Sequence, residues 1–285
     1  ANGAYLLRLT ATDIAGRSTT TTRVIEINTA AKAGNFQTST TDLSLTLGGM
    51  PLAFTRFYDS VAAEFAGVLG FGWRLAGAEL QLTTNVAPSD TDAAGVLNPY
   101  RVGARAYVSL PDVRRVGFTF TPIAIMAGGA TVYRPAWTAD AGVNFQFASA
   151  DAVLELAGGA FYQLGTGLPY NPASGRFTGF AFSLTAPDGT RYDYDAAQRL
   201  RQTTTVGGQK LTWSDSGVVA ASGERVAFLK DANGRLTRIT TAAGGQVTYQ
   251  YNAAGELTGV ESNAGGGNAL YGYDSAGAHL LTLVL

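Results

Sequence analysis

The chain contains no cysteine, and charged residues make up only 14% of its 285 positions. The missing thiols exclude disulfides and thiolate metal sites, so the burial of apolar side chains has to hold the chain together. The net charge of −1 comes without a basic cluster, and we therefore expect no nucleic-acid partner and no anionic membrane surface as a partner. No apolar run approaches the roughly 20 residues that a membrane-spanning helix needs. A start without Met or a signal peptide suggests a piece of a longer, exported protein.

The composition favours strands and turns over helices. Glycine accounts for 36 residues, which is near twice the usual ~7%, and the charged fraction of 14% lies well below the usual ~25%. Turns and strands use Gly, Thr and Tyr, whereas soluble helices use Glu, Lys and Leu. We therefore expect an all-β protein, and its length is sufficient to bury a core.

The last hundred residues repeat one pattern, in which an apolar or aromatic strand is followed by Asp or Asn and then by another apolar strand. Asp and Asn accept hydrogen bonds from the backbone two residues on, and Gly adopts the left-handed conformation that closes a tight loop. Each site is predicted to be a hairpin turn, and a spacing of about 16 to 22 residues predicts a stacked array that favours a wall, shell or fibre over a pocket enzyme. The predicted turn residues are Asp195, Asp215, Asp231, Gly234, Asn252, Gly255, Asp274 and Gly277.

This recurring pattern of Tyr followed by Asp or Asn at the turns resembles the YD repeats of the Rhs family. The match is closest at residues 231–236 (Asp-Ala-Asn-Gly-Arg-Leu) and next at residues 252–257 (Asn-Ala-Ala-Gly-Glu-Leu). The resemblance covers residues 186–285. A second stretch, residues 50–60 followed by residues 67–75, looks like the segment that precedes the repeats in Rhs proteins. The residues singled out in it, each expected to have a structural role, are Arg56, Tyr58, Gly72 and Trp73.

The resemblance implies an architecture and a location. Rhs proteins are large secreted or surface proteins whose repeats curl into a hollow β-shell, often around a toxin, and some repeats have been linked to carbohydrate binding. The architecture is what carries over, because nothing in this sequence looks like the acidic self-cleavage cassette or the toxin that would follow it. We therefore expect a bacterial protein that is secreted or displayed at the cell surface.

Three regions are predicted: residues 1–28, residues 29–185 and residues 186–285. The first reads as a hairpin that resembles the last two strands of a bacterial immunoglobulin-like domain; either the rest of that domain was cut away or the hairpin docks elsewhere, because a lone hairpin is marginal in water. The second is expected to be a capping β-domain of short antiparallel strands, since Gly and Pro interrupt its apolar stretches. Its residues 83–115 are expected to run over the surface. The third is the repeat array.

Within the array the outgoing and returning strands have different patterns. Val247, Tyr249 and Tyr251 alternate with amides and hydroxyls, which predicts one core face and one wet face. The return strands at residues 236–239 and 257–260 place apolar residues three apart, which strict alternation forbids. We therefore predict a β-bulge after each Gly-x-Leu, a defect that bends the sheet and curves the wall.

Candidate catalytic and metal sites have plainer explanations. His279 is the only histidine, which excludes a two-His metal site, and without a Gly-x-Ser-x-Gly elbow it reads as an ordinary strand histidine. Asp193 and Asp195 have the spacing of a carboxylate pair for glycoside hydrolysis, yet both belong to the turn pattern. Asp90 and Asp92 alternate like calcium ligands but lack the later Glu, so a solvated loop is favoured over calcium binding. We predict no catalytic residue, no cofactor and no metal.

The aromatic residues of the repeats allow two interpretations. They could form an exposed stacking surface for sugars, or they could fill the inner face of the sheet, where large rings dominate core energetics. We favour the core, and Trp73 is expected to be a core anchor as well. The repeat aromatics in question are Tyr192, Tyr194, Trp213, Tyr249, Tyr251, Tyr271 and Tyr273.

The sequence therefore predicts a non-enzymatic structural module: a curved antiparallel sheet of stacked hairpins with a capping β-domain before it. The alternative is a surface adhesin that binds glycans, and a glycosidase comes third. The expected partners are flanking repeats or other copies of the chain, paired through open strand edges. Truncation of a longer repeat protein is favoured over a subunit that polymerises head to tail.

Overall fold

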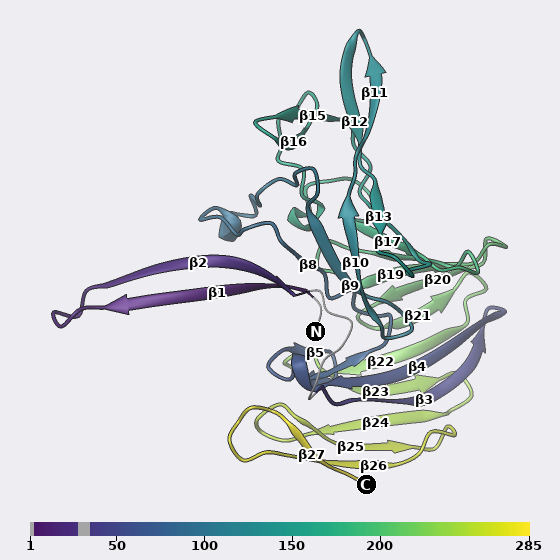
Figure 1. Cartoon of the computed structure of the whole chain (residues 1–285). Helices are drawn as coiled ribbons and strands as arrows, with labels where there is room; N and C mark the ends of the chain where they lie inside the picture. Colours follow the sequence, from purple (N-terminus) through teal and green to yellow (C-terminus); the bar gives the residue numbers. More distant parts are fainter. Residues whose placement is uncertain (1–2, 28–34) are drawn as a thin grey trace.

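The computed structural model describes residues 3–27 and 35–285, and these residues form β-strands joined by turns and three short 3-10 segments (Figure 1). The 3-10 segments are η1 (Ser60–Ala62), η2 (Asp92–Ala94) and η3 (Pro172–Ser174). The expectation of an all-β fold is confirmed. Among the described residues no helix is both long enough and apolar enough to cross a membrane.

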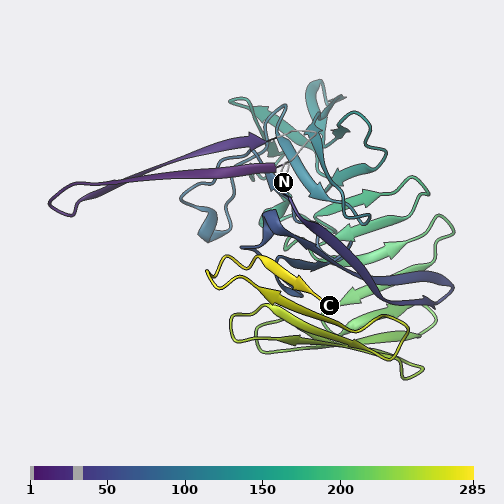
Figure 2. The same cartoon turned by 60° about the horizontal axis from the view of Figure 1, so that its bottom comes forward.

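The largest sheet has 12 strands, and every neighbouring pair in it is antiparallel. From β17 onward the strands follow one another in chain order, as expected for hairpins that stack on their neighbours. The sheet is curved but not closed, so β14 and β27 are its two edges (Figure 2). Its members, in order, are β14 (Gln146–Ser149), β17 (Phe182–Thr185), β18 (Arg191–Tyr194), β19 (Leu200–Thr204), β20 (Lys210–Ser214), β21 (Gly217–Ala220), β22 (Arg225–Lys230), β23 (Leu236–Thr241), β24 (Gln246–Tyr251), β25 (Leu257–Ser262), β26 (Ala269–Tyr273) and β27 (Leu281–Val284).

The predicted bulges are present after both Gly-x-Leu sequences. Lys230 pairs with Leu236 and the next pair is Leu229 with Arg238, so Thr237 is the extra residue of the bulge. The same shift follows Leu257. Each bulge brings two residues three apart onto one face, which explains why Leu236 and Ile239 are both buried.

A second sheet lies across the inner face of the large one. It consists of β3 (Gln37–Leu47), β4 (Met50–Asp59) and β7 (Trp73–Leu75), and Figure 2 shows β3 and β4 in dark blue crossing the strands of the array. The side chains between the two sheets form the main core, in which the ring of Phe54 meets Trp213 and Phe228 edge-on. Aromatic pairs in this geometry stabilise a core beyond the area they bury.

Two four-stranded sheets complete the middle of the chain. One is formed by β13 (Trp137–Ala139), β10 (Arg115–Phe120), β9 (Arg105–Ser109) and β8 (Thr83–Thr84), and the other by β11 (Ile123–Ala127), β12 (Ala130–Arg134), β15 (Leu154–Ala157) and β16 (Ala160–Gln163). The expectation that residues 83–115 run over the surface is wrong for β9. Its residues Tyr107 and Val108 are fully buried, because β9 is an inner strand between β8 and β10 and Val108 packs in the core beneath β17 and β18.

The first described residues form the predicted hairpin, β1 (Gly3–Thr12) and β2 (Ser18–Ile27), which projects away from the rest of the protein (Figure 1). Asp13 closes its turn by accepting hydrogen bonds from the backbone N–H groups of Ala15 and Arg17 at 2.9 and 3.0 Å. Among the described residues this hairpin forms a sheet only with itself. Its relation to an immunoglobulin-like domain stays a prediction, and residues 1, 2 and 28 of that region lie outside the described residues.

Candidate functional site: the turn edge of the repeat array

The five predicted turns lie on one edge of the large sheet, because successive strands run in opposite directions and every second turn returns to the same side. The turn edge, as we call it, comprises residues 195–199, 215–216, 231–235, 252–256 and 274–280, each joining two antiparallel strands. The predicted hairpins are confirmed at all five positions. The turns therefore form a row of polar groups along the wall.

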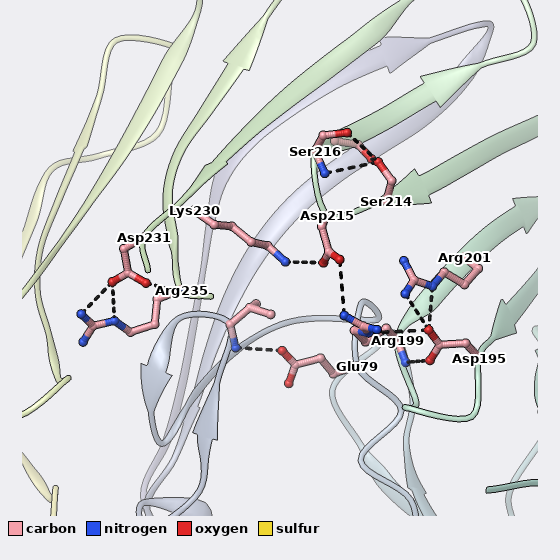
Figure 3. Close-up of polar contacts among 12 residues, drawn as sticks. Glu79, Asp195, Arg199, Arg201, Ser214, Asp215, Ser216, Lys230, Asp231 and Arg235 are labelled. Atoms are coloured by element: carbon pink, nitrogen blue, oxygen red, sulfur yellow. Dashed lines mark hydrogen bonds and ion pairs between the residues drawn. The ribbon is translucent and has the colours of Figure 1, made fainter. Parts of the chain in front are cut away.

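The turn at Asp231 shows the basic geometry. Its carboxylate Oδ1 accepts hydrogen bonds from the backbone N–H groups of Asn233 and Arg235, each at 2.9 Å, and Oδ2 accepts one from the Arg235 side chain at 2.7 Å (Figure 3). Gly234 has a φ of 80°, the left-handed conformation that the loop requires. Burial raises the pKa of Asp231, but the hydrogen bonds from Arg235 and Asn233 outweigh it and hold this pKa below its usual value.

The next turn uses Asn252 in the same position. Its Oδ1 accepts from the backbone N–H of Glu256 at 3.0 Å, and Gly255 has a φ of 87°. The amide of Asn252 also donates to the Glu256 carboxylate at 2.6 Å, and that carboxylate is buried. The amide thus extends the turn's hydrogen-bond network to a buried acid of the same repeat.

The turn at Asp195 replaces glycine with a larger residue. Its Oδ1 accepts from the backbone N–H of Arg199 at 2.9 Å, and its Oδ2 accepts from the Arg201 side chain at 2.7 Å. Gln198 stands where the other repeats have Gly and has a φ of 65°. A non-glycine residue with this φ is uncommon, so the surrounding contacts have to hold it there. The Gln198 side chain accepts a hydrogen bond from the backbone N–H of Leu82 at 2.6 Å, which supplies one such contact.

The turn at Asp274 is longer. Asp274 Oδ1 accepts from the backbone N–H of Leu280 at 2.7 Å, and both Gly277 and His279 have positive φ angles, of 76° and 56°. His279 is therefore not a strand residue as the sequence suggested, because it lies in the turn before β27 in a left-handed conformation. Its Nδ1 is 2.8 Å from a Glu256 carboxylate oxygen, and its ring stacks on Phe71 with centroids 3.8 Å apart.

Asp215 departs from the other turn residues. Its tight turn consists of Asp215 and Ser216 and is followed by Gly217 with a φ of 144°. The contacts of the Asp215 carboxylate go to the two neighbouring repeats: Lys230 Nζ is 2.6 Å from Oδ1, and Arg199 Nη1 is 3.4 Å from Oδ2 (Figure 3). This aspartate links adjacent turns electrostatically, where the sequence predicted a carboxylate bonded to its own turn.

Beside each β-bulge, a tyrosine of the next repeat bonds a backbone carbonyl of the bulged strand. The carbonyl oxygen of Leu236 accepts a hydrogen bond from the hydroxyl of Tyr251 at 2.6 Å, and that of Leu257 accepts one from Tyr273 at 2.7 Å. A buried carbonyl without a partner costs free energy, so each tyrosine stabilises the repeat before its own. The tyrosine of the Tyr-Asp pattern therefore joins consecutive repeats through its hydroxyl as well as its ring.

Residues 66–80, which we call the clasp, follow the turn edge and touch successive repeats. The carbonyl of Val68 accepts from the backbone N–H of Leu236, and the carbonyl of Ala78 accepts from that of Leu200, each at 2.8 Å. Between them, Gly70 approaches Gly255 so closely that a Cβ on Gly70 would lie 2.5 Å from the Gly255 carbonyl oxygen. The clasp includes the two short strands β5 (Ala66–Gly67) and β6 (Gly70–Phe71). The clasp is thus a single segment that contacts several successive repeats at their turns.

Comparison with known protein families gives two matches, one on each partner of this contact. The model described as RHS Repeat matches residues 231–267, and the model described as a domain of unknown function (DUF6531) matches residues 27–94. These matches support an Rhs-repeat protein. They also support a structural, repeat-containing protein in general terms. No curated protein matches the chain.

The DUF6531 match contains the four residues that the sequence pattern singled out before the repeat array. Trp73 is buried and donates from Nε1 to the Tyr273 hydroxyl at 2.8 Å. Tyr58 is buried too, and its hydroxyl donates to the His279 carbonyl and accepts from the Leu281 N–H, both at 3.0 Å. Gly72 has a φ of 72° and lies against the Tyr58 ring, leaving no space for a side chain. The structure brings these three residues together beside the last turn of the turn edge, at residues 274–280.

Arg56, the fourth residue, forms a buried ion pair with Asp42 between the two sheets. Both side chains are almost completely inaccessible to solvent, with relative exposures of 2% and 0%. Two tyrosines of the array complete the network: Tyr249 donates to the Asp42 carboxylate, and the Tyr271 hydroxyl accepts from Arg56 Nε, each at 2.8 Å. Asp42 was not predicted, since a single Asp within a strand carries no sequence signal of burial.

The remaining carboxylates of the edge are held by structural partners. Asp193 is buried in β18 and accepts from Ser183 and from Arg191, whereas Asp195 bonds its own turn. Glu79 in the clasp accepts from the backbone N–H of Val68 at 2.9 Å, and burial raises its pKa (Figure 3). Within residues 3–27 and 35–285 no group of three His, Cys, Asp or Glu side chains is arranged to hold a metal ion.

The aromatic residues of the array face mainly inward. Tyr194, Tyr249 and Tyr271 are buried, and Tyr251 and Tyr273 are partly buried with their hydroxyls bonded to backbone carbonyls. Burial raises the pKa of Tyr194, Tyr249, Tyr251 and Tyr273, because the charged phenolate would be poorly solvated. This arrangement matches the interpretation of these rings as core.

Proposed function

We propose that the chain is a non-enzymatic structural module of an exported protein, in which stacked hairpins form a curved wall and the clasp holds them in register. The observation that carries this proposal is how the backbone N–H and carbonyl groups beside the bulges are hydrogen-bonded. The N–H of Leu236 is bonded by the clasp and its carbonyl by the following repeat. A repeat that depends on two neighbours for its own hydrogen bonds is a part of a continuous wall.

The side chains of the turn edge support the same proposal. Asp195, Asp231 and Asn252 each accept backbone hydrogen bonds of their own turns, and Asp215 joins the turns on either side. Carboxylates used in this way close and connect the hairpins. The burial of most repeat rings supports this proposal over the glycan-binding adhesin, because rings that fill a core are not exposed for stacking on sugars.

The organisation and the contacts of this module are part of the proposal. We assign residues 1–28 to the end of a preceding immunoglobulin-like domain, residues 29–185 to a capping β-domain and residues 186–285 to the repeat array. Flanking repeats or other copies would pair with the open edges at β14 and β27, since an unpaired strand edge presents free backbone donors and acceptors. An exported location agrees with what is common among Rhs-repeat proteins.

The mechanical coupling of the wall can be tested by hydrogen exchange on a clasp variant. Phe71→Ala removes the ring that stacks on His279 and lies against Gly255. Truncating a partly buried ring of this kind destabilises its contacts by roughly 1 to 3 kcal/mol, which is about five- to 150-fold in opening. We expect exchange to accelerate by similar factors at the turns of residues 231–235, 252–256 and 274–280.

The matched control is Phe65→Ala, which removes a ring of the same size that is 68% exposed just before the clasp. It should leave exchange in the repeats unchanged. Faster exchange confined to residues 274–280 in the Phe71 variant would show that the repeats open independently, and the proposed wall would be rejected. Hydrolysis of a polysaccharide by the wild type that Asp193→Asn abolishes would reject the non-enzymatic assignment, and selective, saturable binding on a glycan array would favour the adhesin.

A further inference from the structure

A cleft lies away from the array's core, where the base of the β1–β2 hairpin meets β4, the clasp and the loop before β10. Its volume is about 830 Å³. In Figure 1 these segments come together around β5 and β8. Ligand sites have volumes of about 300 to 1,000 Å³ and combine apolar walls with a few convergent polar groups.

Of the three arginines that line this cleft, Arg114 is paired with Asp112 at 2.6 Å, whereas Arg74 and Arg115 donate to neutral oxygens. Arg74 is 5% exposed, donates to the Gln81 side-chain oxygen at 2.5 Å and to the Val113 carbonyl at 3.3 Å, and stacks over the Phe57 ring. Arg115 donates to the Gln81 carbonyl at 2.7 Å. Burial lowers the pKa of both arginines to about 10, and the charge of Arg74 lowers that of Arg115 further. Both side chains remain cationic at neutral pH.

The carboxylates that face the cleft are engaged by neutral donors. Asp59 accepts from the Gln37 side-chain amide at 3.1 Å and from the Val61 backbone N–H at 3.0 Å. Glu79 accepts from the Val68 N–H. Among residues 3–27 and 35–285 no carboxylate lies within 4.0 Å of the Arg74 nitrogens. The charges of Asp59 and Glu79 still raise the pKa of Arg74, but neither acid forms a direct ion pair with it.

The backbone that positions Arg74 is strained. Gln81 has a φ of 49° and Val113 a φ of 67°, and both residues supply an oxygen to Arg74. A positive φ is a genuine outlier for a β-branched residue such as valine, and strain of this kind collects at ligand-binding positions. Two such residues at one guanidinium are unexpected in a segment that serves only to connect strands.

We propose that this cleft binds a small oxyanion, a carboxylate or a phosphate monoester, carried on an apolar body. Guanidinium groups bind carboxylate and phosphate oxygens through paired, charge-assisted hydrogen bonds. The apolar body would lie against Val61 and Phe65, which line the same cleft and are 42% and 68% exposed. The site is separate from the turn edge, so it adds a binding activity to the structural role.

Isothermal titration of the whole chain with three probes tests this inference: hexanoate, hexan-1-ol and inorganic phosphate. We expect saturable binding of hexanoate with an affinity at least about tenfold above that of the matched neutral alcohol, and weaker binding of phosphate. Arg115→Gln should reduce hexanoate binding by about tenfold or more, while Arg134→Gln, which changes an exposed arginine of β12, should leave it unchanged.

A second pair of variants protects the test against misfolding of the Arg115 variant. Val61→Glu places a negative charge at an exposed position of the cleft, and Val61→Gln is its neutral control. Hexanoate binding should fall in the first and persist in the second, with the thermal unfolding temperatures of both close to that of the wild type. The inference is overturned by the absence of hexanoate binding at tens of millimolar, by equal binding of hexanol, by phosphate binding as tightly as hexanoate, or by equal behaviour of the two Val61 variants.

Discussion

Removing Arg56 should destabilise the protein far more than removing a surface arginine, because it leaves the Asp42 carboxylate buried without a counter-charge. Asp42 has an exposure of 0%, and its remaining polar contact to a side chain is the Tyr249 hydroxyl. Breaking a buried ion pair by deleting one partner typically costs about 3 to 5 kcal/mol. We therefore expect Arg56→Met to lower the free energy of unfolding by about that amount, which is a large fraction of the roughly 5 to 15 kcal/mol of a typical domain.

A double-mutant cycle separates the charge effect from the loss of packing. Asp42→Asn should cost a similar amount, since it strands the guanidinium, but the combination Asp42→Asn with Arg56→Met removes both charges and keeps an amide for Tyr249. The double variant should therefore be more stable than the sum of the single effects predicts, by about 1 to 3 kcal/mol. Arg134→Met, at a pair with exposures of 45% and 75%, is the control and should cost about 1 kcal/mol or less.

Urea unfolding followed by tryptophan fluorescence provides the measurement, because Trp73 and Trp213 both lie at the core between the two sheets. Equal slopes of the unfolding free energy against urea concentration would show that all variants expose the same surface on unfolding, so that their free energies can be compared directly. A cost below about 1 kcal/mol for Arg56→Met, or strict additivity in the double variant, would refute the claim that this buried ion pair stabilises the β3–β4 hairpin against the repeats.

Three further predictions concern the turn edge. Gly70→Ala places a methyl group 2.5 Å from a turn carbonyl, so it should lower the melting temperature. The control is Gly244→Ala, because Gly244 has a similar φ but open space around it, and its melting temperature should fall by several degrees less. Equal shifts would contradict the close approach of the clasp. Tyr251→Phe removes the donor to the Leu236 carbonyl and should cost about 1 kcal/mol in urea unfolding, and an unchanged midpoint would show that water replaces the hydroxyl. The backbone N–H of Leu280 lowers the pKa of Asp274, so its stabilisation is present above the ordinary pKa of about 4 and is lost as the pH falls through the folded value; thermal melts at decreasing pH should show a shallower acid loss for Asp274→Asn, and identical profiles would contradict it.

The local elements of the fold could be predicted because their causes lie within a few residues. The Asp231 turn follows from an acceptor side chain and a glycine three positions later, and the bulge after it follows from Leu236 and Ile239 standing three apart. The hairpin of β1 and β2 follows from two alternating runs around Asp13. In each case the interaction that stabilises the element joins near neighbours in the chain.

The two wrong predictions, for β9 and for His279, concern positions whose structure depends on residues far away in the sequence. β9 carries the same kind of residues as the loops around it, and it is buried only because β10 and β17 provide its neighbours. His279 sits in a left-handed turn that Phe71, more than two hundred residues earlier, covers with its ring. The residues near either position in the sequence do not indicate which distant segment will pack against it.

The amino-acid order alone thus specified a series of hairpins with one apolar face, since turn chemistry and side-chain alternation act over a few bonds. Which segment lies along their edge, which tyrosine bonds which bulged leucine, and which aspartate receives Arg56 were settled by folding in three dimensions. The reason is physical: the place of a bulge follows from the local residue pattern, but the groups that bond the backbone beside it are whichever distant residues the curvature of the sheet brings within about 3 Å.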